Sequence, residues 1–467
     1  MKKILKIVAM LLAIPMMFGA VACGGTPPPP ADAEYEVNYS ALDKNASGTI
    51  KVMRPANVIE DSILDAWIAG FKAEYPNVTV EKAPVDINSY NSTVQKQFQA
   101  NQLADILWCN STNMYYLIAN GIALDLDCFM ADTEAATGFD WKFDDKEDDF
   151  TDEFNMMGVH DGSRYAIPRS IDSVVCLYMK DTVAAAGVNM AQYKDGWTME
   201  EFKTEALKVR EYMVDEFGSN YYPLDPYLEW GSVAWPIVKS LGGEFIGSNG
   251  QFALTEAKAD EVHAFVNDLT DNGIVAPYGV SAGNSFEGGT GAFLWQSTTV
   301  GNFQENLTLK DRFDVVPFPT IGDNPAVGTG FAGYAINSKV ANDQDRLNLV
   351  SAFMAYLMSY EGQQKLADTK ENGGAGWNSV SIRADLGIDN TDANWHKQYS
   401  EDFNMAAYTA NSQYKVGVEF LGNADATYSE DIIAALVSYV GGYCKRETSS
   451  AAYAMLQDDM DEVFNSI

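Results

Sequence analysis

The sequence predicts an α/β fold in which mostly parallel sheets are flanked by helices. Short apolar strands alternate with amphipathic helices along the first part of the chain, and this alternation is typical of a parallel sheet covered by helices. The chain has 467 residues, of which 47% are hydrophobic. This length and composition suffice for a packed globule with two sizeable domains.

The first strand–helix–strand unit lies near the start of the globular part. Residues 49–53 predict a short strand. Apolar residues recur at spacings of three and four from Ile63 to Phe71 and predict an amphipathic helix that is capped near Asp61. The same reasoning predicts a strand at 78–81, a helix around 90–98 and a strand at 105–108.

The rest of the chain continues the mixture of strands and helices. The acidic stretch 144–153 predicts a solvated connection. It lacks the Asp, Asn and Gly register of a calcium loop. Whether a structural calcium ion binds elsewhere stays open. The C-terminal region predicts helices with little strand. The other predicted elements are strands at 173–179, 313–317 and 333–337, and helices at 199–217, 257–272 and 347–357.

The N-terminus has the pattern of an export signal. Lys2, Lys3 and Lys6 form a basic region, an apolar run follows at 7–18, and small residues precede Cys23. The apolar run is too short to span a bilayer comfortably. This arrangement resembles a bacterial lipoprotein signal, in which the cysteine after the cleavage point is acylated.

We therefore expect a signal peptide at 1–22 and a lipidated Cys23. The Pro-rich linker at 23–45 contains four consecutive prolines at 27–30, which form a stiff spacer. The resemblance implies a chain at the extracellular face of the cytoplasmic membrane, held there by its lipid anchor only. The alternative is an ordinary secretory signal with an incidental cysteine.

The composition excludes one class of partner. The chain has 65 acidic residues against 31 Lys and Arg, and its formal net charge is −34. Phosphate backbones repel such a chain, so nucleic acid is not an expected partner. No motif for a cofactor or a metal ion stands out, and none is expected.

Four further cysteines follow Cys23, namely Cys109, Cys128, Cys176 and Cys444. Their spacings match neither a metal clip nor a CxxC motif. Their apolar neighbours favour buried free thiols over the two disulfides that four cysteines could form.

One glycine-rich motif, at 328–333, matches the dinucleotide-binding pattern GxGxxG. That pattern requires a helix that opens at the third glycine, because the helix N-terminus binds the pyrophosphate. The residues that follow, 334–337, predict a continuing strand instead. We therefore assign no nucleotide site to this motif.

Other catalytic motifs are absent from the sequence, which contains neither GxSxG nor HExxH. The three histidines, His160, His263 and His396, are widely separated. This distribution argues against catalytic triads and histidine-rich metal sites. A carboxylate pair for glycoside hydrolysis stays open, since counting acidic residues cannot exclude one.

Eight short stretches follow one another along nearly the whole mature chain. They are FKAEYPNVTV at 71–80, ADILW at 104–108, GIALDL at 121–126, GSRYAIP at 162–168 with LYMKD at 177–181, GWTMEEF at 196–202, WP at 235–236 with GG at 242–243, FAGYAIN at 331–337 and AYLMSYEGQQ at 355–364. In this order, behind a lipoprotein signal, they resemble the family-1 extracellular solute-binding proteins of bacteria. These maltose-binding-protein-like chains are the lipoprotein components of sugar ABC transporters.

The resemblance implies two α/β lobes of the periplasmic-binding-protein type, with the ligand in the cleft between them. Lobe one would comprise 46–168 and 318–362, and lobe two 169–317 and 363–467. The implied function is the capture of a carbohydrate, an oligosaccharide, and its delivery to the permease subunits of an ABC importer. The protein would act as a monomer and would not be an enzyme. The alternatives are an extracellular glycan hydrolase and a sensory lipoprotein.

The family positions also imply which side chains line the cleft. Sugars present apolar C–H faces and rings of hydroxyls, so their sites need aromatic plates and fixed polar groups. The matching positions are Trp108, Asn110 and Ser111; Arg169 and Asp172; Trp230 and Ser232; Arg54 and Asn57; and Trp377 and Asn378.

Three other tryptophans need a separate interpretation. Trp67 and Trp235 lie on apolar helical faces and predict packing. Trp295 is compatible both with a strand core and with the cleft. The family's acidic–basic pair after the tryptophan is replaced here by Ser111 and Thr112, which argues against maltose as the ligand.

The position of Cys23 leads to a test of membrane anchoring. The wild-type protein should partition with membranes, because the acyl chains on Cys23 insert into the bilayer. Cys23→Ser should release the protein into the medium, whereas the control Cys128→Ser should leave it on the membrane. Immunoblotting of membrane and medium fractions measures the distribution. Equal retention of the wild type and Cys23→Ser would contradict lipid anchoring.

Overall fold

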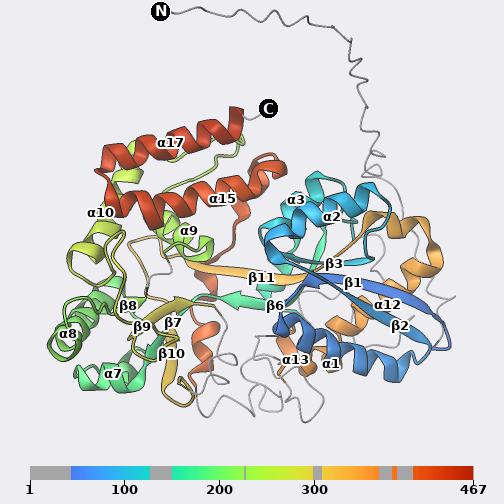
Figure 1. The fold of residues 1–467 in the computed structure, drawn as a ribbon, viewed down its shortest axis with the longest axis horizontal. Coiled ribbons are helices and arrows are strands. Elements are labelled where there is room, and N and C mark those ends of the chain that lie inside the picture. The colour runs from blue at the N-terminus through green and yellow to red at the C-terminus, as the bar shows by residue number, and fades with distance from the viewer. Residues whose placement is uncertain are drawn as a thin grey trace, which may run out of the picture.

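The computed structural model describes residues 44–126, 150–225, 228–297, 308–367, 381–386 and 403–465. These residues form two lobes, each with its own sheet and helices, and strands connect the lobes (Figure 1). Lobe one holds the N-terminal strands, and lobe two holds the C-terminal helices. The predicted α/β fold class is confirmed. Within the described ranges, no helix is both long enough and apolar enough to cross a membrane.

The sheet of lobe one has six strands in the order β12-β11-β3-β1-β2, with β6 also beside β11. β1 pairs in parallel with β2 and β3, whereas β11 pairs antiparallel with β3 and β6. A short hairpin of β4 and β5 precedes β6. The strands are β1 (Gly48–Pro55), β2 (Val78–Val85), β3 (Ile106–Asn110), β4 (Val159–His160), β5 (Ser163–Arg164), β6 (Ala166–Ser173), β11 (Val327–Ile336) and β12 (Lys415–Val416).

Helices cover both faces of this sheet (Figure 1). α12 is buried along nearly its whole length because it lies between the sheet, α1 and α13. The helices and 3₁₀ turns are α1 (Val58–Glu74), η2 (Ile87–Ser89), α2 (Tyr90–Gln99), α3 (Asn113–Ala119), α6 (Asp152–Met156), η4 (Ser338–Asn342), α12 (Gln344–Met358), α13 (Tyr360–Ala367) and η6 (Ala384–Leu386).

The predicted first helix is confirmed as α1, but it begins one turn before the predicted cap. The side chain of Asn57 accepts a hydrogen bond from the backbone N–H of Glu60 at 2.8 Å and so caps the helix. Trp67 is fully buried on the inner face of α1, and its indole N–H donates to the carbonyl of Gly362 at 2.7 Å. The prediction that Trp67 belongs to the core is therefore confirmed.

The sheet of lobe two has four strands in the order β10-β7-β9-β8. β8, β9 and β10 run in one direction, and β7 is antiparallel to both of its neighbours. The prediction of a mostly parallel sheet is therefore wrong for lobe two, because β7 enters directly from β6 between two strands that run the opposite way. α8 begins with a capping box between Thr198 and Glu201. The strands are β7 (Val175–Met179), β8 (Leu224–Asp225), β9 (Phe293–Gln296) and β10 (Phe313–Pro317).

The helices of lobe two come from two separate parts of the chain, as the green and red ribbons in Figure 1 show. Trp235 is 2% exposed in α9, which confirms that it packs in the core. The helices are α7 (Lys180–Ala185), η3 (Met190–Tyr193), α8 (Met199–Phe217), α9 (Gly231–Ser240), α10 (Glu256–Asp271), η7 (Met405–Tyr408), η8 (Ser412–Tyr414), η9 (Glu419–Asn423), η10 (Ala426–Tyr428), α15 (Ser429–Ser438), the π-helical turn η11 (Tyr439–Tyr443), α16 (Cys444–Arg446) and α17 (Ser449–Asn465).

β6 and β11 connect the two lobes. Only Val174 separates β6 from β7 of lobe two, and its backbone N–H donates to the carbonyl of Gly328 at 2.8 Å. β12 also pairs with the start of β11, at Val327 and Gly328. The chain limits of each lobe stay a prediction. The sheet pairings nevertheless put all of β6, through Ser173, and β12 on the lobe-one sheet.

The glycine-rich motif at 328–333 lies within β11, which confirms that the chain continues as a strand. Gly328 serves close packing here. A Cβ atom at this position would lie 1.7 Å from the carbonyl oxygen of Ser232, so only glycine lets α9 approach the strand this closely.

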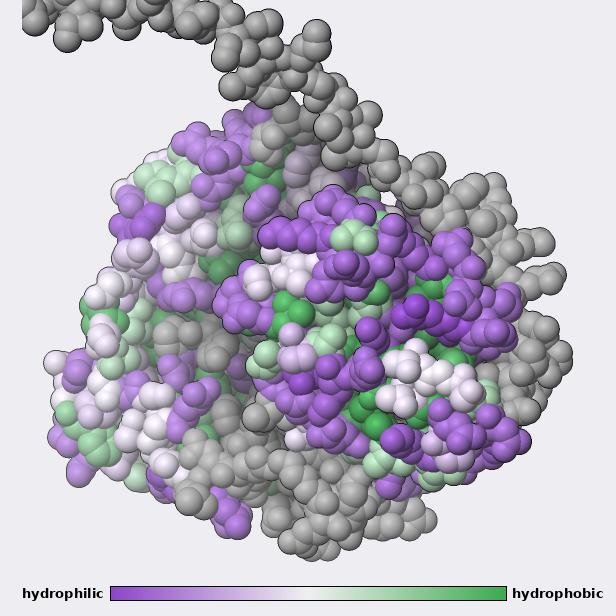
Figure 2. Space-filling model, turned by 45° about the vertical axis from the view of Figure 1, so that its right-hand side comes forward, coloured by the Kyte–Doolittle hydropathy of each residue, from purple (hydrophilic) through white to green (hydrophobic). Residues whose placement is uncertain are grey.

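The surface is largely hydrophilic on the face that Figure 2 shows. Apolar side chains occur there in small groups. The large apolar side chains that are exposed within the described ranges lie on several separate elements, namely Ile87, Met156, Leu207, Phe217, Tyr278 and Val280.

Three cysteines in the described ranges, Cys109, Cys176 and Cys444, are free and buried. Burial raises the pKa of all three thiols, that of Cys444 to about 12. The prediction of buried free thiols is confirmed for these three residues. Cys128 lies outside the described residues.

These thiols should be inert in the folded protein, because attack on a disulfide reagent requires an accessible thiolate. A variant that carries Cys23→Ser and Cys128→Ser isolates the three thiols. Ellman's reagent should detect none of them in the native protein and all of them in guanidinium chloride. Fast reaction of any thiol before unfolding would contradict its burial.

Candidate ligand-binding site

A pocket of about 270 Å³ lies beside β11, where residues of both lobes meet. Its walls come from three parts of the chain. These are the end of β3 with the start of α3, the turn after α6, and the segment 415–419. Phe331 of β11 also lines it.

The first wall is fixed by the turn from β3 into α3. The side-chain oxygen of Asn110 accepts from the backbone N–H groups of Thr112 and Asn113 at 3.0 and 2.9 Å. Ser111 then pairs with Phe331, because the backbone N–H of Phe331 donates to Oγ of Ser111 at 2.9 Å. This wall therefore shares hydrogen bonds with the strand that connects the lobes.

The second wall is the end of α6 and the turn that follows it. Its lining residues are Met156, Met157, Gly158 and Val159. The carbonyl of Gly158 accepts from the backbone N–H groups of Tyr165, just before β6, at 2.8 Å and of Ala166, the first residue of β6, at 3.1 Å. This wall is therefore attached to the first residues of a connecting strand.

The third wall is the segment from β12 into η9, which contributes Lys415, Glu419 and the residues between them. The next residue, Phe420, packs on Trp235 of α9 with 4.5 Å between the ring centroids. This segment therefore pairs with the lobe-one sheet at one end and enters the core of lobe two at the other. The pocket consequently lies between the lobes.

The pocket combines apolar and polar groups. Met114, Tyr115 and Phe331 supply apolar surface. Ser111, Lys415 and Glu419 supply polar atoms. Burial, with a smaller contribution from the Glu419 charge, raises the pKa of Tyr115 to about 12. The phenol therefore stays protonated at neutral pH and can donate a hydrogen bond. Such a lining can bind a ligand with both apolar faces and hydroxyl groups.

Of the residues predicted from sequence, Ser111 lines this pocket. Asp172 is half-buried on β6 and lies opposite Gly330, the neighbour of Phe331, in the β6–β11 ladder. Trp230 and Ser232 are half-buried at the start of α9, which packs on β11. The structure thus brings these residues to the same strand, and their contact with a ligand stays a prediction.

Trp108 and Asn110 lie on β3 but have local partners. Trp108 is 9% exposed and meets the ring of Tyr90 edge-on, with 5.6 Å between the centroids. Asn110 holds the turn into α3. In this structure both residues support the first wall.

Three other predicted residues lie around α1 and β6. Arg54 is buried and ion-pairs with Asp61. Asn57 caps α1. Arg169 is buried, and its guanidinium donates to a carboxylate oxygen of Glu60 at 2.9 Å.

The remaining predicted residues are separate from the pocket or outside the described ranges. Trp295 is 1% exposed in β9 and packs against Phe202 and Phe318, so of its two interpretations the structure shows the strand core. Trp377, Asn378 and Cys23 lie outside the described residues.

Sequence reasoning missed much of the lining. Phe331 lies inside the family-like stretch at 331–337, and Met114 and Tyr115 follow a predicted strand end, so position could have suggested them. The segment 415–419 carries no comparable signal, because β12 has only two residues and pairs with a strand far away in the sequence.

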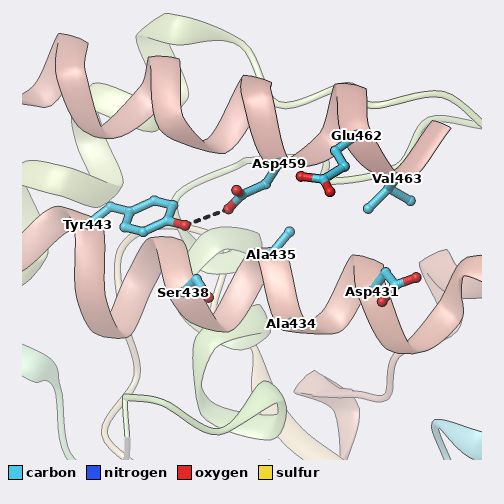
Figure 3. A pocket seen from close by; sticks show the side chains of 8 residues that line it. All are labelled: Asp431, Ala434, Ala435, Ser438, Tyr443, Asp459, Glu462 and Val463. Atoms are coloured by element: carbon cyan, nitrogen blue, oxygen red, sulfur yellow. Dashed lines mark hydrogen bonds between the residues drawn. The ribbon is translucent and has the colours of Figure 1, made fainter. Parts of the chain in front are cut away.

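A larger pocket, of about 360 Å³, lies between α15 and α17 (Figure 3). The hydroxyl of Tyr443 donates to a carboxylate oxygen of Asp459 at 2.7 Å, and Asp431 and Glu462 also line this pocket. All of its lining residues belong to the C-terminal helices, so both walls are in lobe two. Within the described part of the chain, no group of three or more His, Cys, Asp or Glu side chains is arranged to hold a metal ion.

The fold is similar to those of known binding proteins. The GacH receptor of Streptomyces glaucescens, solved unliganded and with acarbose, has a TM-score of 0.68 and 17% identity over 89% of this chain and 98% of its own. Lmo0181 of Listeria monocytogenes, in complex with cycloalternan, has a TM-score of 0.66 and 16% identity, and the match covers 90% of this chain and 99% of Lmo0181. UgpB of Mycobacterium tuberculosis, in complex with glycerophosphocholine, has a TM-score of 0.65 and 17% identity, and the match covers 90% of this chain and 99% of UgpB.

No curated protein sequence matches the chain. The family model for bacterial extracellular solute-binding proteins, however, matches residues 66–375, more than half of the chain. The matched region runs from α1 to beyond α13 and includes both connecting strands. The chain therefore belongs to the bacterial extracellular solute-binding protein family.

Proposed function

We propose that this protein captures a carbohydrate, an oligosaccharide, and delivers it unchanged to the permease subunits of an ABC importer. The observation that carries the proposal is the position of the pocket, between lobe-one strand ends and a segment that enters the core of lobe two. A ligand in this pocket touches both lobes and favours their closed arrangement. GacH and Lmo0181, which share the fold, bind acarbose and cycloalternan.

The proposed contacts combine the pocket lining with predicted residues that pair with β11 or begin the helix that packs on it. Ser111, Tyr115 and Lys415 would provide hydrogen bonds. Asp172 would accept from paired hydroxyls, and Trp230 would offer a ring face to the sugar. Trp377 and Asn378 are further proposed contacts. Trp108, Asn110 and Arg169 would hold the binding residues in place.

The proposal includes the location of the protein. A monomer acylated at Cys23, after removal of residues 1–22, would stand on the extracellular face of the cytoplasmic membrane. The linker at 23–45 would let the lobes reach the permease. A phosphodiester solute is the second candidate ligand, because UgpB shares the fold and binds glycerophosphocholine.

A ligand screen tests the proposed function. A ligand that binds only the folded protein at 100 times its dissociation constant adds about 2.7 kcal/mol to the free energy of unfolding. Thermal-shift measurements with maltotriose, acarbose, cycloalternan and plant oligosaccharides should therefore raise the melting temperature for a few of these compounds. If glycerophosphocholine or an amino acid raises it and no carbohydrate does, the ligand class is wrong.

Two substitutions test the proposed contacts. Tyr115→Phe and Asp172→Asn should each weaken binding of an identified ligand by about 5- to 100-fold, because each removes a hydrogen-bonding partner. Tyr278→Phe is the matched control, because Tyr278 is 52% exposed on lobe two and does not line the pocket. The Tyr278→Phe variant should bind the ligand with the affinity of the wild type.

Isothermal titration calorimetry measures these affinities, and chromatography of the recovered ligand detects any cleavage. Unchanged affinity in both variants would refute the contacts. Cleaved ligand, with cleavage lost in Asp172→Asn, would make the protein a hydrolase.

A further inference from the structure

One wall of the pocket, formed by the end of α6 and the turn after it, is built on a very short helix. α6 has five residues, too few to be stable as an isolated helix. Met156, its last residue, lines the pocket with a side chain that is 54% exposed. The backbone position from which Met156 reaches the pocket therefore depends on contacts from other residues.

Arg164 supplies such contacts by donating hydrogen bonds to backbone carbonyls of this segment. This residue is 2% exposed, and its guanidinium donates to the carbonyls of Met157 at 2.9 Å and Phe154 at 3.3 Å. It also reaches the carbonyl of Ala166 at 3.4 Å. The planar guanidinium carries five donors, so one side chain can satisfy several carbonyls at the end of a helix.

The ring of Phe154 packs on the guanidinium of Arg164. The central carbon of the guanidinium lies 4.3 Å from the centroid of the Phe154 ring, and Phe154 stacks on Phe150 at 4.4 Å. A cation over an aromatic face is stabilised by the ring electrons, more so where water is excluded. The turn, Arg164 and both rings therefore form one packed unit.

Gly158 attaches this unit to β6. Its φ of +77° is in the region that favours glycine, and a Cβ atom there would lie 2.2 Å from the carbonyl oxygen of Ala166. Its own carbonyl accepts from Tyr165 and Ala166, as described above. A side chain at this position would force the turn away from the strand.

We propose that Arg164 is a positioning residue for ligand binding, which holds the Phe154–Gly158 turn so that Met156 contacts the ligand. The assignment of Met156 as a contact rests on the proposed function of the pocket. Thioether side chains are flexible and polarisable, so Met156 can cover the apolar face of a bound sugar. Arg164 itself is buried and acts through the turn.

The positioning role is testable without any ligand, by hydrogen–deuterium exchange of a peptide that contains Tyr165 and Ala166. Arg164→Met removes the donor for the carbonyls of Phe154 and Met157 and so loosens the turn. These two amides should therefore exchange about 10-fold faster than in the wild type. Arg164→Lys keeps the charge but places its donors on a single nitrogen, so it should give an intermediate rate. Gly158→Ala should accelerate the same amides while Arg164 is intact.

Arg346→Met is the matched control. It removes an arginine that ion-pairs with the 1% exposed Asp105, just before β3 and at the opposite end of that strand from the pocket. It should lower the melting temperature but leave exchange at Tyr165 and Ala166 unchanged. Wild-type exchange of these amides in both Arg164→Met and Gly158→Ala would overturn the positioning role.

Calorimetry then tests the contact, with whichever of maltotriose, acarbose or cycloalternan binds the wild type. Arg164→Met and Met156→Ala should each weaken binding by about 5-fold or more, whereas Arg346→Met should bind normally. Wild-type affinity in both pocket variants would overturn the role of the turn in binding. If the wild type binds no carbohydrate, the proposed function fails, and the exchange rates still decide whether Arg164 holds the turn.

Discussion

The pairing of β6 with β11, and the buried ion pair that anchors it, is the constraint on which the two-lobed arrangement depends. Arg169 of β6 donates to Glu60 of α1 at 2.9 Å, and the hydroxyl of Tyr334 of β11 donates to the same carboxylate at 3.2 Å. Breaking such a pair leaves a charge buried without compensation, at a cost of about 3–5 kcal/mol. Both strands are therefore fixed to lobe one. Relative rotation of the lobes must involve the connections beyond the lobe-one strands, among them Val174, 318–326 and 417–418.

The elements of the fold could be predicted where local pattern determines them. Periodicity identified α1, α8 and α12, and the strand character of 334–337 excluded a nucleotide site. The start of α1 was missed because the cap is made by Asn57, a single side chain whose role depends on geometry. The antiparallel setting of β7 could not be read at all, since pairing direction depends on partners far away in the sequence.

The site was harder to predict, for a related reason. Ser111 could be identified because a strand end is a local feature, and it does line the pocket. Arg54 and Arg169 also lie on strands next to polar sequence, yet their charges pair with Asp61 and Glu60 on α1. Sequence shows that a charged side chain is present but not which distant group neutralises it. The segment 415–419 reaches the pocket only through its pairing with β11.

The methionine side chains around the pocket have a consequence for selectivity. Met114, Met156 and Met157 can each rotate about three side-chain bonds and refill space that a smaller ligand leaves empty. Phe331 and Ser111, by contrast, are fixed to each other by two hydrogen bonds, one between their backbones and one from the Phe331 N–H to Oγ of Ser111. The methionine-lined side of the pocket can therefore change its shape to fit the ligand, whereas the side formed by Ser111 and Phe331 is rigid. Ligands of different shape can be accepted, provided that each places the same chemical group against Ser111 and Phe331.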